Sequence, residues 1–158
     1  MGARWVTLAL GLLAGCSGVP WQPEAFNQAA RVEAMELRFA EDGTGLLTLR
    51  VQVRNPSPDA ALLTGVDFEL AVDGLRLAMG LQQVEVPLGA DGLPRTVELS
   101  FPLVSEGAVS KEPRVMRRVR LRGGVLLRYG AGTERRAPFH LEREQRLPHV
   151  PLPEPKLE

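Results

Sequence analysis

Apolar and polar residues alternate along four long stretches of this chain. In the clearest of them, Leu47, Leu49, Val51 and Val53 are separated by polar residues. A period of two is typical of strands with one buried and one exposed face. The alternating stretches are 47–53, 66–72, 97–103 and 119–129, and shorter candidate strands are 35–39, 75–80, 83–86 and 137–143. The pattern therefore predicts about seven or eight strands.

Short turn signals separate these stretches. Asn55-Pro56 follows the first of them, and Asp73-Gly74 has the composition of a type I′ hairpin turn. Only residues 107–118 have the composition of a short helix. We therefore expect an all-β chain, an antiparallel immunoglobulin- or fibronectin-III-like β-sandwich with one short helix.

The first sixteen residues have the layout of a secretory signal. Arg4 precedes an apolar run from Trp5 to Leu13, which is about half the length that a membrane span needs. Residues 13–16 (Leu-Ala-Gly-Cys) resemble a bacterial lipobox, in which the cysteine thiol receives diacylglycerol and the peptide is cut before it. The resemblance implies a protein lipidated on Cys16; the alternatives are an ordinary signal peptide or a buried strand with an incidental cysteine. With Ser17 after the cysteine, we expect export and sorting to the outer membrane, facing the periplasm of a bacterium with two membranes.

The rest of the chain divides into three parts. Residues 16–31 are expected to be the lipidated N-terminus and a tether, with Trp21 or Phe26 as candidates to rest on the domain or the lipid surface. Residues 32–146 hold all the predicted strands. Residues 147–158 contain four prolines, which remove backbone donors and favour an extended tail. That tail is a candidate recognition segment, although a plain tail is the simpler interpretation.

Composition and charge restrict the function. The chain has 19 Lys and Arg against 19 Asp and Glu, a balance that disfavours nucleic-acid binding. A single cysteine excludes an internal disulfide and a thiolate metal cluster. The neutral total conceals an acidic segment, residues 55–110, and a basic segment, residues 111–146.

A dense cluster of arginines lies in the basic segment, namely Arg114, Arg117, Arg118, Arg120 and Arg122. On a strand, the side chains of residues 118, 120 and 122 would point the same way, toward anionic lipid head groups or an acidic partner. The alternative, which we favour, is that acidic and basic strands become neighbours and pair across the sheet.

Several short motifs resemble the late-embryogenesis-abundant (LEA) type 2 family, also called the water-stress and hypersensitive-response (WHy) domain. A valine-rich strand ends in Asn-Pro-Ser-Pro at 55–58, and a second strand with an aromatic at 68 leads to an Asp-Gly turn and a small-residue strand ending in glycine. The residues that carry the resemblance are Asn55, Pro56, Pro58, Gly74 and Gly80. It covers about residues 32–143 and implies a role in desiccation or osmotic-stress tolerance through surface contacts with proteins or membrane.

Each motif residue also has a physical reason to be there. Pro56 ends a strand, Asn55 can bond its own backbone two residues on, and Gly74 and Gly80 permit a positive φ. The motif is thus a fold signature without a nucleophile, base or metal ligand.

Candidate chemistry is sparse elsewhere. Alternation places His140 on an exposed face, and His149 lies in the proline-rich tail. Asp67 and Glu69 are expected on the solvated side of a strand, and Gly123-Gly124 is predicted as a bulge. We expect no catalytic residue, no metal, no small-molecule substrate and no cofactor beyond the acyl lipid on Cys16. The alternative function is a protein-binding module in envelope assembly or transport, using an edge strand, the arginines or the tail to dock an envelope protein.

Overall fold

The computed structural model describes residues 22–104, 115–130 and 132–147. Its elements are α1 (Pro23–Asn27), β1 (Ala30–Phe39), β2 (Thr44–Val53), β3 (Ala61–Val72), β4 (Leu75–Leu88), β5 (Arg95–Val104), β6 (Met116–Tyr129) and β7 (Thr133–Arg146). The predicted strands at 75–80 and 83–86 are one continuous strand, β4. The described residues thus form seven strands, against the expected seven or eight.

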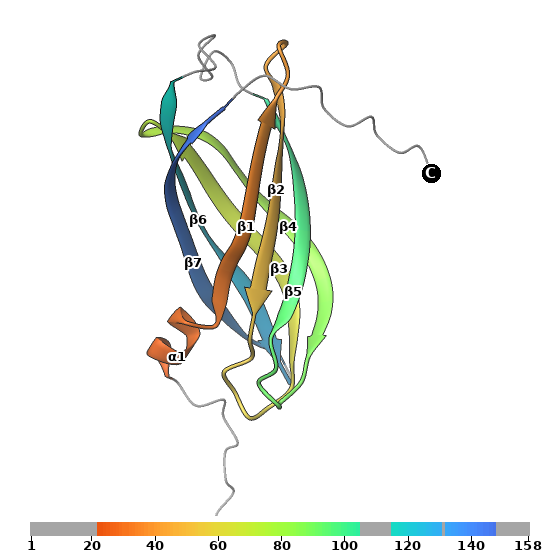
Figure 1. Cartoon of the computed structure of the whole chain (residues 1–158). Helices are drawn as coiled ribbons and strands as arrows, with labels where there is room; N and C mark the ends of the chain where they lie inside the picture. The colour runs from red at the N-terminus through yellow and green to blue at the C-terminus, as the bar shows by residue number, and fades with distance from the viewer. Residues whose placement is uncertain (1–21, 105–114, 131, 148–158) are drawn as a thin grey trace, which may run out of the picture.

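Seven strands form two antiparallel sheets that face each other. One sheet has the order β1-β2-β5, and the other has the order β4-β3-β6-β7. The strands run along the long axis of the molecule, with α1 at one end (Figure 1). The predicted all-β sandwich is confirmed.

Alternate residues of the strands fill the space between the sheets. Leu47, Leu49 and Val51 of β2 are completely buried, as are Leu63 and Val66 of β3. Each such side chain stabilises the fold by about 1.5–3 kcal/mol through the loss of apolar surface to water. Alternation in the sequence therefore reports the inner face correctly.

The short helix lies elsewhere than predicted. The described part of the predicted helix 107–118 is residues 115–118, of which 116–118 belong to β6, and residues 107–114 lie outside the described residues. The Arg118 amide donates to the Asp73 carboxylate at 3.0 Å, and the Asp73 amide donates to the Arg118 carbonyl at 2.9 Å. These bonds to the turn between β3 and β4 extend β6 upstream, where local composition alone favours a helix.

The only helix of the described residues, α1, occupies the predicted tether. Residues 22–31 do not form a simple link, because Phe26, Ala29 and Ala30 are buried in the core. Pro23 at the first turn suits a helix start, and the Arg54 amide donates to the Ala29 carbonyl at 2.8 Å. Five residues cannot cross a membrane, and no other helix in the described ranges could.

The packed domain is longer than 32–146 at both ends. It begins with α1 and includes Leu147, which is buried although the predicted tail starts there. Cys16, Trp21 and residues 148–158 lie outside the described residues.

The predicted bulge at Gly123-Gly124 is wrong. Both residues lie inside β6, and the register around them runs without a shift toward β3 and toward β7. Neither has a positive φ. Glycine is needed for space: a Cβ on Gly123 would come within 2.2 Å of the Asp67 carbonyl oxygen and 2.5 Å of the Phe139 ring. The two glycines therefore allow close approach of neighbouring groups.

Candidate functional site

The corner between β2 and β3 is organised around Asn55, a buried side chain. Its amide nitrogen donates to the carbonyls of Asp59 at 2.7 Å and Gly89 at 3.0 Å. Its oxygen accepts from the Ser57 amide at 3.0 Å and from the Tyr129 hydroxyl at 2.9 Å. The bond to residue 57 is the predicted turn contact. All four hydrogen-bonding positions of the amide are used, so this corner is a structural junction.

Tyr129 is the residue at this junction that the sequence motif does not indicate. Its ring is buried and meets Phe26 of α1 edge-on, with ring centroids 6.3 Å apart. Burial raises the pKa of the Tyr129 phenol from 10.0 to about 12, so the hydroxyl keeps its proton as a donor. One signal was available: Tyr129 is the only tyrosine of the chain and stands on the inward side of an alternating strand.

The two prolines of the motif shape the corner without entering the core. Pro56 is half-buried and Pro58 is exposed. Both lie between β2 and β3, where their missing N–H groups cost no ladder bond. The Asp59 amide instead donates to the Ser57 hydroxyl at 3.1 Å.

Gly74 and Gly80 have different roles. Asp73 and Gly74 have φ values of 50° and 85°, which confirms the type I′ geometry predicted for this turn. Gly80 has no positive φ, so the conformational reason expected for it is wrong. It lies opposite Phe68, and a Cβ there would approach the Phe68 ring to 2.8 Å. Phe68 in turn packs on Phe101 of the other sheet, at 4.3 Å between centroids.

Acidic neighbours pair with three of the clustered arginines. Arg117 bonds Asp73 at 2.6 Å, and Arg118 and Arg120 both reach Glu142, at 3.7 and 3.1 Å. The bonds from Arg117 and from the Arg118 amide lower the pKa of Asp73 below its usual value. These three arginines are therefore paired, although Asp73 lies in the turn between β3 and β4 and Glu142 lies on β7, inside the basic segment.

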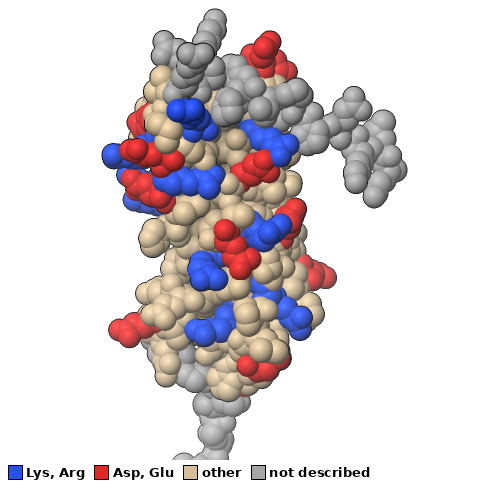
Figure 2. Space-filling view, viewed as in Figure 1, with Lys and Arg blue, Asp and Glu red and all other residues tan. Residues whose placement is uncertain are grey.

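The remaining two arginines of the cluster differ from these. Arg122 is exposed, and no ion pair of the described residues contains it. Arg114 lies outside the described residues. Figure 2 shows basic and acidic side chains interspersed over the face in view. Contact of the arginines with an anionic surface stays a prediction.

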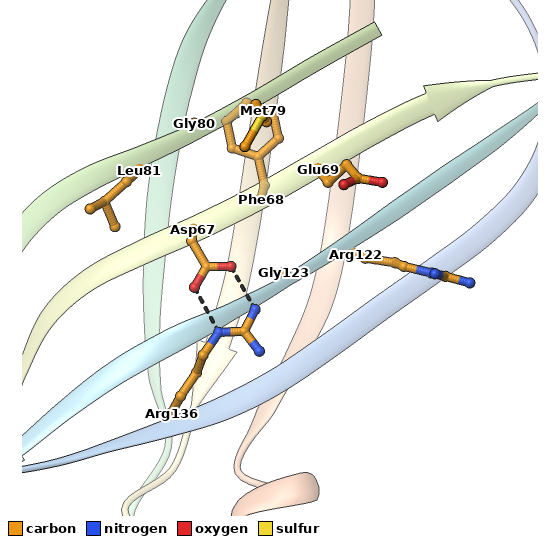
Figure 3. Close-up of a pocket in the computed structure, with 9 residues that line it drawn as sticks. All are labelled: Asp67, Phe68, Glu69, Met79, Gly80, Leu81, Arg122, Gly123 and Arg136. Carbon is orange, nitrogen blue, oxygen red and sulfur yellow. Dashed lines mark hydrogen bonds and ion pairs between the residues drawn. The ribbon is translucent and has the colours of Figure 1, made fainter. Parts of the chain in front are cut away.

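A shallow groove of about 550 Å³ crosses the outer face of the four-stranded sheet (Figure 3). At one end, Arg136 of β7 holds Asp67 of β3 with two bonds of 2.6 and 2.8 Å. This pairing raises the pKa of the Arg136 guanidinium. Met79 and Leu81 of β4 border the groove, with exposed fractions of 68% and 58%. The groove combines apolar and charged groups on an open surface.

No set of catalytic groups converges in this groove. Asp67 and Glu69 lie on the outer side of β3, as predicted, and Asp67 is engaged by Arg136. His140 of β7 is exposed, also as predicted, and stands opposite Arg122 in the register; His149 lies outside the described residues. Within residues 22–104, 115–130 and 132–147, no three His, Cys, Asp or Glu side chains are grouped to hold a metal.

Known proteins share this architecture. A protein from Arabidopsis thaliana, At1g01470, matches with a TM-score of 0.67 and 14% identity, over 92% of this chain and 95% of its own. The solution structure of a candidate LEA protein, At2g46140.1, matches with a TM-score of 0.51 and 16% identity, over 77% and 71% of the two chains. The fold is LEA-like. A protein from Archaeoglobus fulgidus matches with a TM-score of 0.53 and 15% identity, over 75% of this chain and 99% of its own.

Comparison of the sequence alone finds no relative of this chain. No family model matches the chain, and no curated protein matches it. The likeness in structure, at 14–16% identity, establishes the fold.

Proposed function

We propose that this chain is a non-enzymatic, lipid-anchored envelope protein whose LEA-like domain supports desiccation or osmotic-stress tolerance through surface contacts. The observation that carries the proposal is the Asn55 corner. The residues that resemble the LEA type 2 pattern form a turn, a hairpin and a glycine–aromatic contact in a sandwich of LEA-like fold. Both the resemblance of these residues to the LEA type 2 pattern and the LEA-like fold support the proposal.

The anchor belongs to the α1 end of the molecule in this proposal. Cys16 carries the diacylglycerol, and residue 22, where the described chain begins, is the sixth residue after it. Six extended residues reach about 20 Å. The outer membrane, on its periplasmic side, then lies next to α1 and the Asn55 corner.

Surface contact is the mode of action that suits such a domain. Its outer strand faces carry charged side chains of both signs, such as Arg120 with Glu142 and Asp67 with Arg136. Surface pairs of this kind contribute at most about 1 kcal/mol each, so they can exchange partners at low free-energy cost. Weak contact at many points with proteins or membrane needs neither a cofactor nor a small-molecule substrate.

Drying experiments test the protective role. A labile enzyme is dried and rehydrated with the purified chain, or with the same mass of an unrelated β-sandwich. We expect more recovered activity with this chain and no stable complex in solution. Equal recovery of enzyme activity with both proteins would contradict the proposed role in stress tolerance.

Membrane fractionation with acyl labelling tests the anchor. The Cys16→Ser chain should lose the acyl label and leave the membrane fraction, whereas a Ser17→Ala control keeps both. Membrane retention and labelling of Cys16→Ser would contradict lipidation at this residue.

The second candidate function is a protein-binding module, and the exposed apolar row on β4 is the observation that favours it. Met79 and Leu81 are 68% and 58% exposed on the outer side of an edge strand. Affinity capture after crosslinking in intact cells separates the two functions. A defined envelope protein recovered with the chain supports the module, and its absence together with protection on drying supports the stress role.

A further inference from the structure

The four edge strands of the sandwich differ in how they are protected against pairing with another strand. Natural sheets protect their edges with proline, bulges and inward-pointing charges. β7 contains Pro138 and the half-buried Arg143, which donates to the Met35 carbonyl of β1 at 2.5 Å. β1 has a register shift between Val32 and Ala34, and β5 contains Pro102.

β4 has register shifts between residues 76 and 78 and between residues 83 and 86, and it contains Pro87, but its middle has none of these protections. Residues 78–83 pair with residues 65–70 of β3 in unbroken register, and β4 pairs with no other described strand. This stretch contains no proline and no charged residue. It forms a border of the four-stranded sheet (Figure 1), and its outer side bears Met79 and Leu81. An edge with unpaired backbone groups and exposed apolar side chains is a template for strand addition.

From this edge we infer that two copies of the chain associate through β4, antiparallel about a two-fold axis at Gly80. Residues that face each other across an antiparallel pair lie on the same side of the sheet. When Gly80 faces Gly80 of the second copy, facing residues of the two strands lie on the same side of the sheet. Met79 then faces Leu81 of the second copy, and the two-fold axis repeats the contact, so that four apolar side chains form one patch.

Charges on β4 are self-complementary in this arrangement. Arg76 lies four residues before Gly80, and Glu85 lies five residues after it. Both are exposed, and no ion pair of the described residues contains either. The two-fold axis places Arg76 at the same end of the interface as Glu85 of the second copy, beyond the register shifts that flank residues 78–83, and it repeats this arrangement at the other end. Opposite charges on neighbouring strands stabilise the pair, and like charges destabilise it.

The mass of the full chain in detergent, measured by sedimentation over a wide range of concentration, tests this inference. We expect a reversible dimer. Leu81→Lys should weaken association by about tenfold or more, because the two-fold axis places two charges in the apolar patch. Leu93→Lys is the matched control, since Leu93 is 60% exposed but lies between β4 and β5, away from the edge.

A charge exchange tests the antiparallel arrangement. Arg76→Glu and Glu85→Arg should each weaken the dimer, because each creates like charges twice, and the double variant should restore it. Circular dichroism of every variant verifies that the sandwich is folded. A chain that stays monomeric at all concentrations would overturn the inference. So would a dimer that is unaffected by Leu81→Lys and by both single charge reversals. The inference rests on β4 alone and is independent of the proposed stress role.

Discussion

At the scale of the residue, Asn55 shows how one side chain can organise the end of a sandwich. The carbonyls of Asp59 and Gly89, the Ser57 amide and the Tyr129 hydroxyl all meet its amide in a buried space. A buried polar group that loses its partner costs more than the net gain of the bond. The corner therefore depends on this residue more than on the prolines beside it.

Asn55→Ala should lower the free energy of unfolding by about 2–4 kcal/mol, because it leaves several buried polar groups unpaired. Tyr129→Phe removes one bond and should cost about 1 kcal/mol. Denaturant unfolding measures both. Asn27→Ala, at an exposed position of α1, is the control and should change stability by less than about 0.5 kcal/mol. Equal effects of Asn55→Ala and Asn27→Ala would contradict the role of the corner.

The raised pKa of Tyr129 predicts a pH dependence at the alkaline end. Its pKa is about 12 in the folded chain against 10.0 for the ordinary phenol, so the folded state prefers the protonated form. This contribution to stability is fully present below pH 10.0 and is lost as pH rises toward about 12. Tyrosinate absorbance should titrate near 12 when folded and near 10 in denaturant. Because Tyr129 is the only tyrosine, the signal has one source, and Tyr129→Phe should abolish it. A midpoint near 10 in the folded chain would contradict the buried donor.

At the scale of the element, glycines decide how closely strands and side chains approach. Gly80 and Gly123 stand opposite Phe68 on its two sides, from β4 and β6. Phe139 stands opposite Gly123 from β7. Rings and glycines thus alternate across the four-stranded sheet, and each ring occupies the space that its glycine neighbour leaves.

Neighbouring glycines of β6 allow a matched comparison. A Cβ on Gly123 meets the backbone oxygen of Asp67 at 2.2 Å, so Gly123→Ala must move a strand and should cost about 3 kcal/mol. A Cβ on Gly124 meets the end of the Arg136 side chain at 2.6 Å, and that side chain can move away. Gly124→Ala should lose the pair with Asp67 and cost no more than about 1 kcal/mol. Thermal and denaturant unfolding measure both variants, and a larger cost at Gly124 would contradict the assignment.

At the scale of the whole molecule, the position of α1 decides which end of the sandwich would face the membrane in the proposed anchoring through Cys16. β6 has 14 residues and spans about 45 Å between the two ends. Its first residues, with Arg117 and Arg118, lie at the end away from α1 (Figure 1). Anchored upright through Cys16, the molecule would hold these arginines far from the lipid surface.

Energy transfer to labelled lipid head groups tests this orientation. A donor dye is placed on Ala90→Cys, at the α1 end, or on Glu41→Cys, at the opposite end; both positions are exposed turns. Since Cys16 carries the lipid in the proposed mature chain, the new thiol is the labelling site. We expect stronger transfer from position 90, and the unsubstituted chain controls for stray labelling. Stronger transfer from position 41 would favour contact between the arginines and the membrane.

The alternation of apolar and polar residues was enough to predict the sandwich. An inward apolar face leaves a period of two, which is visible within seven or so residues. The Asp73-Gly74 turn was also predictable from local sequence. Positive φ values at two successive residues strongly favour glycine, asparagine or aspartate.

Interactions between distant residues decided the rest. The bonds between Asp73 and Arg118 make residues 116–118 a strand, and the contact of Phe26 with Tyr129 turns the expected tether into a packed helix. Three further features depend on which strands become neighbours. They are the pairing of arginines with Glu142, the four hydrogen bonds of Asn55 and the open edge of β4. Local sequence determines the period of a strand, but only the tertiary structure determines what lies beside it.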